Sequence, residues 1–373
     1  MDSTESLSII TFAILYFKLN LARFRPFMKA EFAMITKETA TLTSHSVAIH
    51  YDIYLDSARQ DYKALILIAH GMIEHREKYA PIATFLAQRG FIVAVNDHRG
   101  HGDSINCEFR GDSQKGDSIN CDSPQGDSTQ IAEKIYLGEM GENGFERALR
   151  DMYNLHLALK SRFNPPKFVL IGHSMGSLLA RRFLQDYEKS LDMLILCGSP
   201  SPQRFIKVGI VFLKILHFFG VNNIARHIAN RFSLLAFNAK YARFDKLKNG
   251  KNSGTLWINR DTLELQKAIA NKKSYFTFTI NSFICLFCGL ERVFSKYRRA
   301  TLSPKLPILF ISGEDDACGG FGRGVLRAFK HLKSQGYENA KLILYANARH
   351  ELFLELNKDE VFNDVLCFLE ENL

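Results

Sequence analysis

The pentapeptide Gly172 to Gly176 has the form GxSxG, follows directly on the apolar run Lys167 to Ile171, and constrains the fold more than any other feature of this chain. The apolar run predicts a buried strand and Ser177 to Leu184 predicts a helix, so Ser174 falls on a sharp strand-to-helix turn. A serine in strained backbone geometry needs neighbours without a Cβ, because strand and helix must approach closely there. We therefore expect Gly172 and Gly176 to be structural requirements and Ser174 to be a nucleophile.

Short apolar runs alternate with helical patterns along most of the chain. Residues 39–55 alternate as a β-hairpin does, and the runs typical of buried parallel strands are 64–69, 91–95, 168–171, 193–196, 308–311 and 342–345. Helical patterns occupy 79–88, 144–163, 177–187, 325–334 and 360–370. This alternation predicts an α/β fold with a mostly parallel, doubly wound sheet.

Two segments interrupt the alternation. Residues 105–130 are of low complexity, with repeated Gly-Asp-Ser triplets and a second copy of Gly102 to Cys107 at Gly116 to Cys121, and we expect a mobile surface loop there. Residues 201–302 are expected to form a helical lid over the carboxyl edge of the sheet. The predicted organisation is an extension at 1–33, a first part of the core at 34–200, the lid, and a second part of the core at 303–373.

The net charge of +9 belongs to one segment of the chain. Residues 201–300 hold 18 Lys and Arg against four acidic residues, a net charge of +14, which leaves −5 for the remainder. The basic residues are interleaved with apolar ones, and nucleic-acid-binding motifs are absent from the sequence, so we expect contact with an anionic membrane rather than with nucleic acid. A solvated face on a helical insertion is the alternative that stays open.

The N-terminal segment and the cysteines bear on the cellular location. Leu7 to Phe17 is an apolar run of eleven residues, shorter than the roughly 20 that span a bilayer. It is either an interfacial anchor or an upstream extension of a protein that starts at Met28 or Met34. The seven cysteines follow no disulfide framework and indicate a cytoplasmic protein, with membrane association left open. The CxxC formed by Cys285 and Cys288 lies in an apolar run and is interpreted as core packing.

A serine nucleophile requires a base, and the base requires an orienting carboxylate. The run 308–311 is followed by Glu314, Asp315 and Asp316, and the run 342–345 is followed by His350. The carboxyl ends of parallel strands meet at one edge of a sheet, so the acid and the histidine are expected to lie near Ser174. His350 is the candidate base, and three consecutive acids leave the carboxylate open at this point.

Acyl transfer also needs N–H donors aimed at the developing oxyanion. His70 and Gly71 follow the strand 64–69, so the backbone N–H of Met72 and that of Met175 are the candidate pair. His70 is expected to pack beneath this loop, and the residues 97–102 to form a structural turn. The chemistry requires no metal and no organic cofactor.

Five motifs in order resemble one known family, the bacterial lysophospholipase and monoacylglycerol lipase-like serine hydrolases of the α/β-hydrolase fold. They are HGMIEH (70–75), DHRGHGDS (97–104), GHSMGS (172–177), SGEDD (312–316) and ARHELFLE (348–355). The resemblance runs from about residue 40 to 373. It implies a nucleophile at Ser174, an acid at Asp316 and a base at His350, which hydrolyse the carboxylic ester of a single-chain lipid, a lysophospholipid or a monoacylglycerol, through an acyl-enzyme.

The sequence departs from the family pattern in two places. Ala317 follows Asp316 where the family usually has proline, which keeps Asp315 as an alternative acid, and the Gly-Asp-Ser repeats are additional. A triad fixes the reaction type but not the leaving group, so a broad esterase or a serine peptidase remains an alternative. A catalytically silent membrane-binding module is the other alternative, and the sequence gives no oligomeric state.

Overall fold

The computed structural model describes residues 34–110, 118–121, 134–242, 254–297 and 299–373, so the predicted extension at 1–33 lies outside the described residues. Eight strands form one sheet in the order β1-β2-β4-β3-β7-β8-β9-β10. Their bounds are β1 (Ile35–Ser44), β2 (Val47–Asp56), β3 (Leu65–Ala69), β4 (Ile92–Asn96), β7 (Phe168–His173), β8 (Met193–Cys197), β9 (Ile308–Gly313) and β10 (Ala340–Tyr345).

The six strands from β4 to β10 in this order are parallel to one another, whereas β1 and β2 form an antiparallel hairpin at one edge. His45 and Ser46 close the hairpin with φ angles of 48° and 62°, as a two-residue turn between twisted strands requires. Every residue of β3, β4, β7, β8 and β9 is buried, which explains their continuous apolar runs. The carboxyl ends of all six strands therefore reach the same edge of the sheet.

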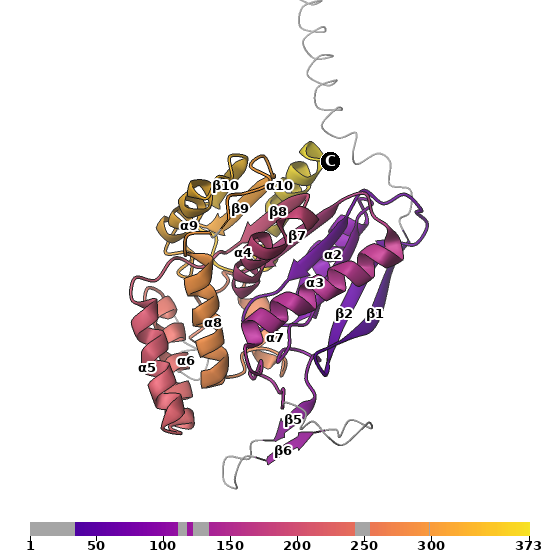
Figure 1. Cartoon of the computed structure of the whole chain (residues 1–373). Helices are drawn as coiled ribbons and strands as arrows, with labels where there is room; N and C mark the ends of the chain where they lie inside the picture. The colour runs from indigo at the N-terminus through magenta and orange to yellow at the C-terminus, as the bar shows by residue number, and fades with distance from the viewer. Residues whose placement is uncertain (1–33, 111–117, 122–133, 243–253, 298) are drawn as a thin grey trace, which may run out of the picture.

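Helices cover both faces of the sheet (Figure 1). One face packs against α3 (Gly144–Phe163), α4 (Met175–Tyr187) and α9 (Arg323–Ser334), and the other against α2 (Ala80–Ala87) and α10 (Lys358–Glu371). Short 3₁₀ turns are η2 (Arg76–Tyr79), η3 (Glu188–Ser190) and η4 (Leu352–Leu354). The result is the predicted α/β architecture, a mostly parallel sheet between two layers of helices.

The residues from 201 to 302, called here the helical insertion, connect β8 to β9. Their helices are α5 (Ile206–Phe218), α6 (Asn222–Asn238), α7 (Thr262–Ala270) and α8 (Ile280–Val293). The helix α8 packs against α3 and α4 of the core, and α5 and α6 pack on α8 farther out (Figure 1). None of the helices within the described residues is long and apolar enough to cross a membrane.

Two elements differ from the sequence-based expectations. The strand β10 was expected to be fully buried, but it is the edge strand of the sheet and only Tyr345 in it is buried, because no strand covers its outer side. The low-complexity segment was expected to be a loop, yet β5 (Cys107–Arg110) and β6 (Ser118–Cys121) pair as an antiparallel hairpin. The last residue of the first copy, Cys107, pairs with the last residue of the second, Cys121, and the remaining residues of β6 pair with 108–110, which follow the first copy. Composition alone does not reveal this pairing; residues 111–117 and 122–133 lie outside the described residues.

Candidate active site

Ser174 occupies the turn between β7 and α4, with φ 52° and ψ −116°, a conformation that residues with a Cβ rarely adopt. The glycines on either side permit this turn. A Cβ on Gly172 would lie 2.4 Å from the carbonyl oxygen of Gly176, and a Cβ on Gly176 would lie 2.0 Å from that of Ala69. Both contacts are with backbone, which cannot move aside, so larger residues are excluded at these two positions.

Asp316 and His350 meet beyond the ends of β9 and β10. The Nδ1 of His350 lies 3.0 Å from Oδ2 of Asp316, and the other carboxylate oxygen accepts the backbone N–H of Cys318 at 2.8 Å. Burial alone would raise the pKa of Asp316, but the interactions with His350 and with backbone N–H groups outweigh it and hold that pKa below its ordinary value. Asp315 instead pairs with Lys240 of the insertion at 2.7 Å, so the geometry distinguishes the two acids.

Ser174 is brought to the same place as this pair. Its backbone N–H donates to the carbonyl of Cys197, the last residue of β8, at 3.0 Å. The imidazole of His350 packs against Gly198, the residue after Cys197. A Cβ on Gly198 would lie 3.2 Å from the ring. The side chain of Ser174 also interacts with the thiol of Cys318, whose N–H binds Asp316. The serine, the histidine and the carboxylate therefore converge at the carboxyl ends of β7, β8, β9 and β10.

The two backbone N–H groups predicted for an oxyanion lie beside this turn. Met175 is the first residue of α4, where N–H groups have no partner within the helix and the helix dipole favours negative charge. Gly71, which precedes Met72, approaches the serine closely, since a Cβ there would lie 3.1 Å from that of Ser174. Within the described part of the chain, neither N–H has an intramolecular acceptor, and both are available to a ligand oxygen.

A buried network of charged and polar groups supports the loop that carries Met72. The carboxylate of Glu74 accepts the N–H of Gly71 at 3.0 Å and the hydroxyl of Tyr79 at 2.7 Å. Nδ1 of His173 lies 2.8 Å from the Tyr79 oxygen, and its Nε2 lies 3.2 Å from the carbonyl oxygen of His350. Both ring nitrogens of His173 thus face acceptors, as in an imidazolium. Burial opposes this charge, but Glu74 overcomes burial and raises the pKa of His173.

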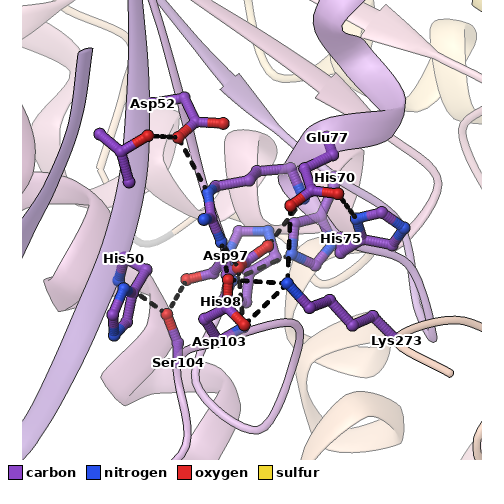
Figure 2. Close-up of polar contacts among 12 residues, drawn as sticks. His50, Asp52, His70, His75, Glu77, Asp97, His98, Asp103, Ser104 and Lys273 are labelled. Atoms are coloured by element: carbon purple, nitrogen blue, oxygen red, sulfur yellow. Dashed lines mark hydrogen bonds and ion pairs between the residues drawn. The ribbon is translucent and has the colours of Figure 1, made fainter.

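A second charged cluster joins the insertion to the core (Figure 2). The guanidinium of Arg76 pairs with Asp97, with Asp52 at 3.1 Å and with Asp103 at 2.8 Å. Lys273 of the insertion reaches the same Asp103 at 2.8 Å. Asp97 and Asp103, at the two ends of this turn, anchor the cluster, and Asp103 fixes the insertion next to the loop that carries Met72.

His70 is fully buried beneath the loop that carries Met72. Its Nδ1 donates to the carbonyl of Gly71 at 2.7 Å, and its Nε2 accepts the backbone N–H of His98 at 3.0 Å. The ring lies tilted against those of His98 and His101, at centroid distances of 4.2 and 5.1 Å. Burial and these neighbouring imidazoles hold the pKa of His70 well below its ordinary value. The residue is a neutral support of the loop.

Sequence reasoning assigned no role to several side chains at this site. Glu74 and His173 lie inside recognised motifs, so their position was a usable signal, whereas their partner Tyr79 carries no local signal. The described ranges contain no group of three or more His, Cys, Asp or Glu side chains arranged to hold a metal ion. Cys285 and Cys288 are both partly buried on α8.

A serine on a sharp turn after one parallel strand, with an acid and a histidine after two later strands, defines an α/β-hydrolase. The family comparison agrees with this class. The model of the Hydrolase_4 family, described as "Serine aminopeptidase, S33", matches residues 60–357. The chain belongs to this family.

Similar proteins include lipases and esterases. The monoglyceride lipase of Rattus norvegicus is 23% identical over 309 residues, which cover 82% of this chain and 80% of that protein. Among solved structures, a thermostable carboxyl esterase from Bacillus coagulans in complex with glycerol has a TM-score of 0.71 and 21% identity, covering 90% of this chain and 98% of its own. A soluble variant of the Saccharomyces cerevisiae monoglyceride lipase has a TM-score of 0.60 and 14% identity, covering 93% and 100%. The predicted resemblance to monoacylglycerol lipase-like α/β-hydrolases is confirmed.

Proposed function

We propose that this α/β-hydrolase is a carboxylic-ester hydrolase that acts on a single-chain lipid, a monoacylglycerol or a lysophospholipid. The observation that carries the proposal is the contact between His350 and Asp316 at 3.0 Å, placed beside a serine on a strained turn. Relatives named as monoglyceride lipases over most of the chain favour a lipid ester as the substrate.

In the proposed mechanism His350 is the general base. Asp316 occupies its Nδ1, which leaves Nε2 to take the hydroxyl proton of Ser174 as Oγ attacks the ester carbonyl. The tetrahedral intermediate collapses when His350 returns this proton to the leaving alcohol, and the acyl group stays on Ser174 as an ester. Water deprotonated by His350 then attacks the acyl-enzyme, the fatty acid leaves, and Ser174 regains its proton.

The oxyanion of both tetrahedral intermediates is assigned to the N–H groups of Met72 and Met175. Peptide groups supply this stabilisation, so the methionine side chains are incidental. Glu74 contributes by fixing Gly71, and removal of one such donor in hydrolases costs about 3 kcal/mol of transition-state stabilisation. No cofactor takes part in these steps.

The helical insertion is the proposed lid and the proposed membrane contact. Residues on and beside α5 expose large apolar side chains: Phe205, Val208, Val211, Phe212, Ile215, Phe218 and Phe219. Lys207 and Lys214 lie on the same helix, and such a mixture of apolar and basic residues suits the interface of an anionic bilayer. A protein placed there would take its substrate from the membrane surface.

A serine peptidase is the second candidate, because the family description names an aminopeptidase. A triad acts on esters and amides alike, so the leaving group must be tested directly. Parallel assays of a monoacylglycerol, lysophosphatidylcholine, a short nitrophenyl ester and an aminoacyl arylamide separate the candidates. We expect turnover of the two lipids to exceed that of the arylamide by orders of magnitude, and the reverse order would replace the lipase proposal by the peptidase.

Labelling with a fluorophosphonate probe tests the nucleophile. The wild-type protein should react and Ser174→Ala should not. Ser199→Ala is the matched control, because Ser199 is a buried serine just after β8 that hydrogen-bonds Ser177 at 3.1 Å instead of the histidine. A folded wild-type protein that resists the probe would support a catalytically silent module.

A further inference from the structure

The chain has a single tryptophan, and the insertion places it against the candidate base. Trp257 lies in the turn that precedes α7 and is 6% exposed. Its ring lies 5.0 Å from that of His350, centroid to centroid, with an interplanar angle of 39°. A residue from the inserted segment thus contacts the imidazole that the mechanism protonates.

The turn that carries Trp257 is fastened to both chain neighbours of His350. The guanidinium of Arg349 donates to the carbonyl of Asn259 at 3.0 Å, and it also binds the carbonyl of Leu256. The backbone N–H of Glu351 donates to the carbonyl of Ile258 at 2.9 Å. These hydrogen bonds hold the backbone of the turn beside the backbone on both sides of His350, and so keep the two rings on adjoining segments.

The contact has an electrostatic consequence for the reaction. His350 becomes an imidazolium each time it takes a proton, and a cation within about 6 Å of an indole face is attracted by the ring quadrupole. The attraction is stronger when the cation is desolvated, and His350 is buried. It acts on the charged form only, so it favours the transition state over the resting enzyme.

The indole N–H is a second indication that Trp257 does more than fill space. In the described part of the chain it is buried without a hydrogen-bond acceptor, although a buried unpaired donor is destabilising. A ring that merely filled space would avoid this cost with a phenylalanine. Unpaired buried donors in native proteins call for a functional explanation.

We propose that Trp257 is a positioning residue for His350, which holds the imidazole in place and stabilises the imidazolium that forms during catalysis. The proposal rests on the proposed function, since it assigns His350 as the base. It also gives the insertion a role beyond covering the site, because the insertion supplies a side chain on which the rate of proton transfer depends.

Other charged groups also face His350 and enter any pH dependence. Asp316 binds Nδ1, and the ring of His173 lies 4.8 Å away. The groups behind His173 and on the flanking residues are Glu74, Lys78, Glu351, Arg349 and Cys318. These groups are the same in every Trp257 variant, so a difference between variants reports the indole.

Two substitutions separate the π contact from packing. Trp257→Leu keeps an apolar side chain without a ring, and Trp257→Phe keeps a ring of smaller size. With a short nitrophenyl ester, we expect Trp257→Leu to lower kcat about tenfold at similar KM. The acid limb of the plot of kcat/KM against pH should also move about one pH unit lower. Both changes correspond to about 1.4 kcal/mol. Trp257→Phe should retain most of the rate.

Phe237→Leu is the matched control. Phe237 lies on α6, and its ring centroid is 4.8 Å from that of Trp257. Among the described residues, its ring makes no contact with the ring of His350. It should leave the acid limb in place. Equal losses in the Leu and Phe variants with an unmoved acid limb would overturn the proposal and leave only packing. If the wild type itself lacks esterase activity and resists the fluorophosphonate, the proposed function fails instead.

A fluorescence titration tests the contact without turnover. Protonated imidazole quenches indole emission, and the chain's single tryptophan makes that emission specific for this site. As the pH is lowered, we expect wild-type emission to fall, with a midpoint equal to that of the acid limb of the kcat/KM profile. Ser174→Ala should behave in the same way, and His350→Gln should show no such transition. A transition that persists in His350→Gln, or none in the wild type, would overturn the proposal.

Discussion

Glu74→Gln removes a carboxylate that joins the loop carrying Met72 to His173, the residue before Ser174. In the native protein Glu74 is buried, accepts hydrogen bonds from Gly71 and Tyr79, and faces Nδ1 of His173 at 3.5 Å and Lys78 at 3.5 Å. Burial disfavours the carboxylate, but Lys78 and His173 outweigh burial and hold the pKa of Glu74 well below its ordinary value. The substitution keeps the shape of the side chain and removes its charge.

The expected loss of unfolding free energy is about 3 kcal/mol. Breaking a buried ion pair by removal of one partner costs about 3–5 kcal/mol, and the amide retains one acceptor oxygen, which favours the lower value. Glu77→Gln is the matched control in the same segment. Its carboxylate is 44% exposed and pairs with Lys273 at 3.5 Å, so its loss should stay below about 1 kcal/mol.

The pH dependence of the difference between wild type and Glu74→Gln identifies its origin. The lowered pKa of Glu74 gives a contribution that is present above its ordinary value of 4.5 and is lost as the pH falls. The raised pKa of His173 gives one that is complete below its ordinary value of 6.5 and is lost as the pH rises through the folded-state value. The difference should therefore be largest between pH 4.5 and 6.5.

Urea unfolding of wild type and both variants at pH 5.5 and at pH 8.5 measures these differences. At pH 8.5 the Glu74→Gln loss should shrink but persist, because Lys78 still pairs with the carboxylate. A loss equal to that of Glu77→Gln, or one that grows from pH 5.5 to 8.5, would refute the assigned charges of this network.

Three further predictions follow from single sites. Gly176→Ala should abolish folding or lower the melting temperature strongly, because the added Cβ would collide with backbone atoms. Gly209→Ala is the control: a Cβ there meets nothing within 4 Å, so this substitution should stabilise α5 by up to about 1 kcal/mol in the same thermal melts. Burial lowers the pKa of His156 to about 4, so the wild type should lose about 1 kcal/mol relative to His156→Leu between pH 6.5 and 5 in urea unfolding, and parallel curves would contradict this. Replacing Phe212 and Phe218 by Asp should reduce co-sedimentation with anionic liposomes at least tenfold without loss of activity on a soluble ester, and unchanged binding would exclude α5 as the contact.

The sequence predicted the features of the fold that depend on local pattern. Continuous apolar runs identified the buried strands, and the glycines of the GxSxG motif identified the turn at Ser174, because only glycine permits the observed approach to backbone. The run at β10 has the same composition as the others. Its exposed position depends on its place at the edge of the sheet, which composition does not encode.

Features of the site that depend on contacts between distant parts of the chain were harder to predict from the sequence. The family pattern implied Asp316 and left Asp315 as an alternative, and the structure shows that Lys240 pairs with Asp315 whereas His350 pairs with Asp316. The position of Trp257 depends on hydrogen bonds between the insertion and a segment about 90 residues later, for which the sequence carries no local sign. The insertion was predicted as a lid over the carboxyl edge of the sheet, but the contact of its Trp257 with His350 was not predicted.

The most direct test of the central claim is to trap the acyl-enzyme. The wild-type protein is mixed with a nitrophenyl ester, quenched in acid within the first turnovers, digested and examined by mass spectrometry. The account predicts one acyl group on the peptide that contains Ser174, no adduct and no turnover in Ser174→Ala, and slower formation in His350→Gln. Rapid turnover by Ser174→Ala, or an acyl group carried on a different residue, would contradict it.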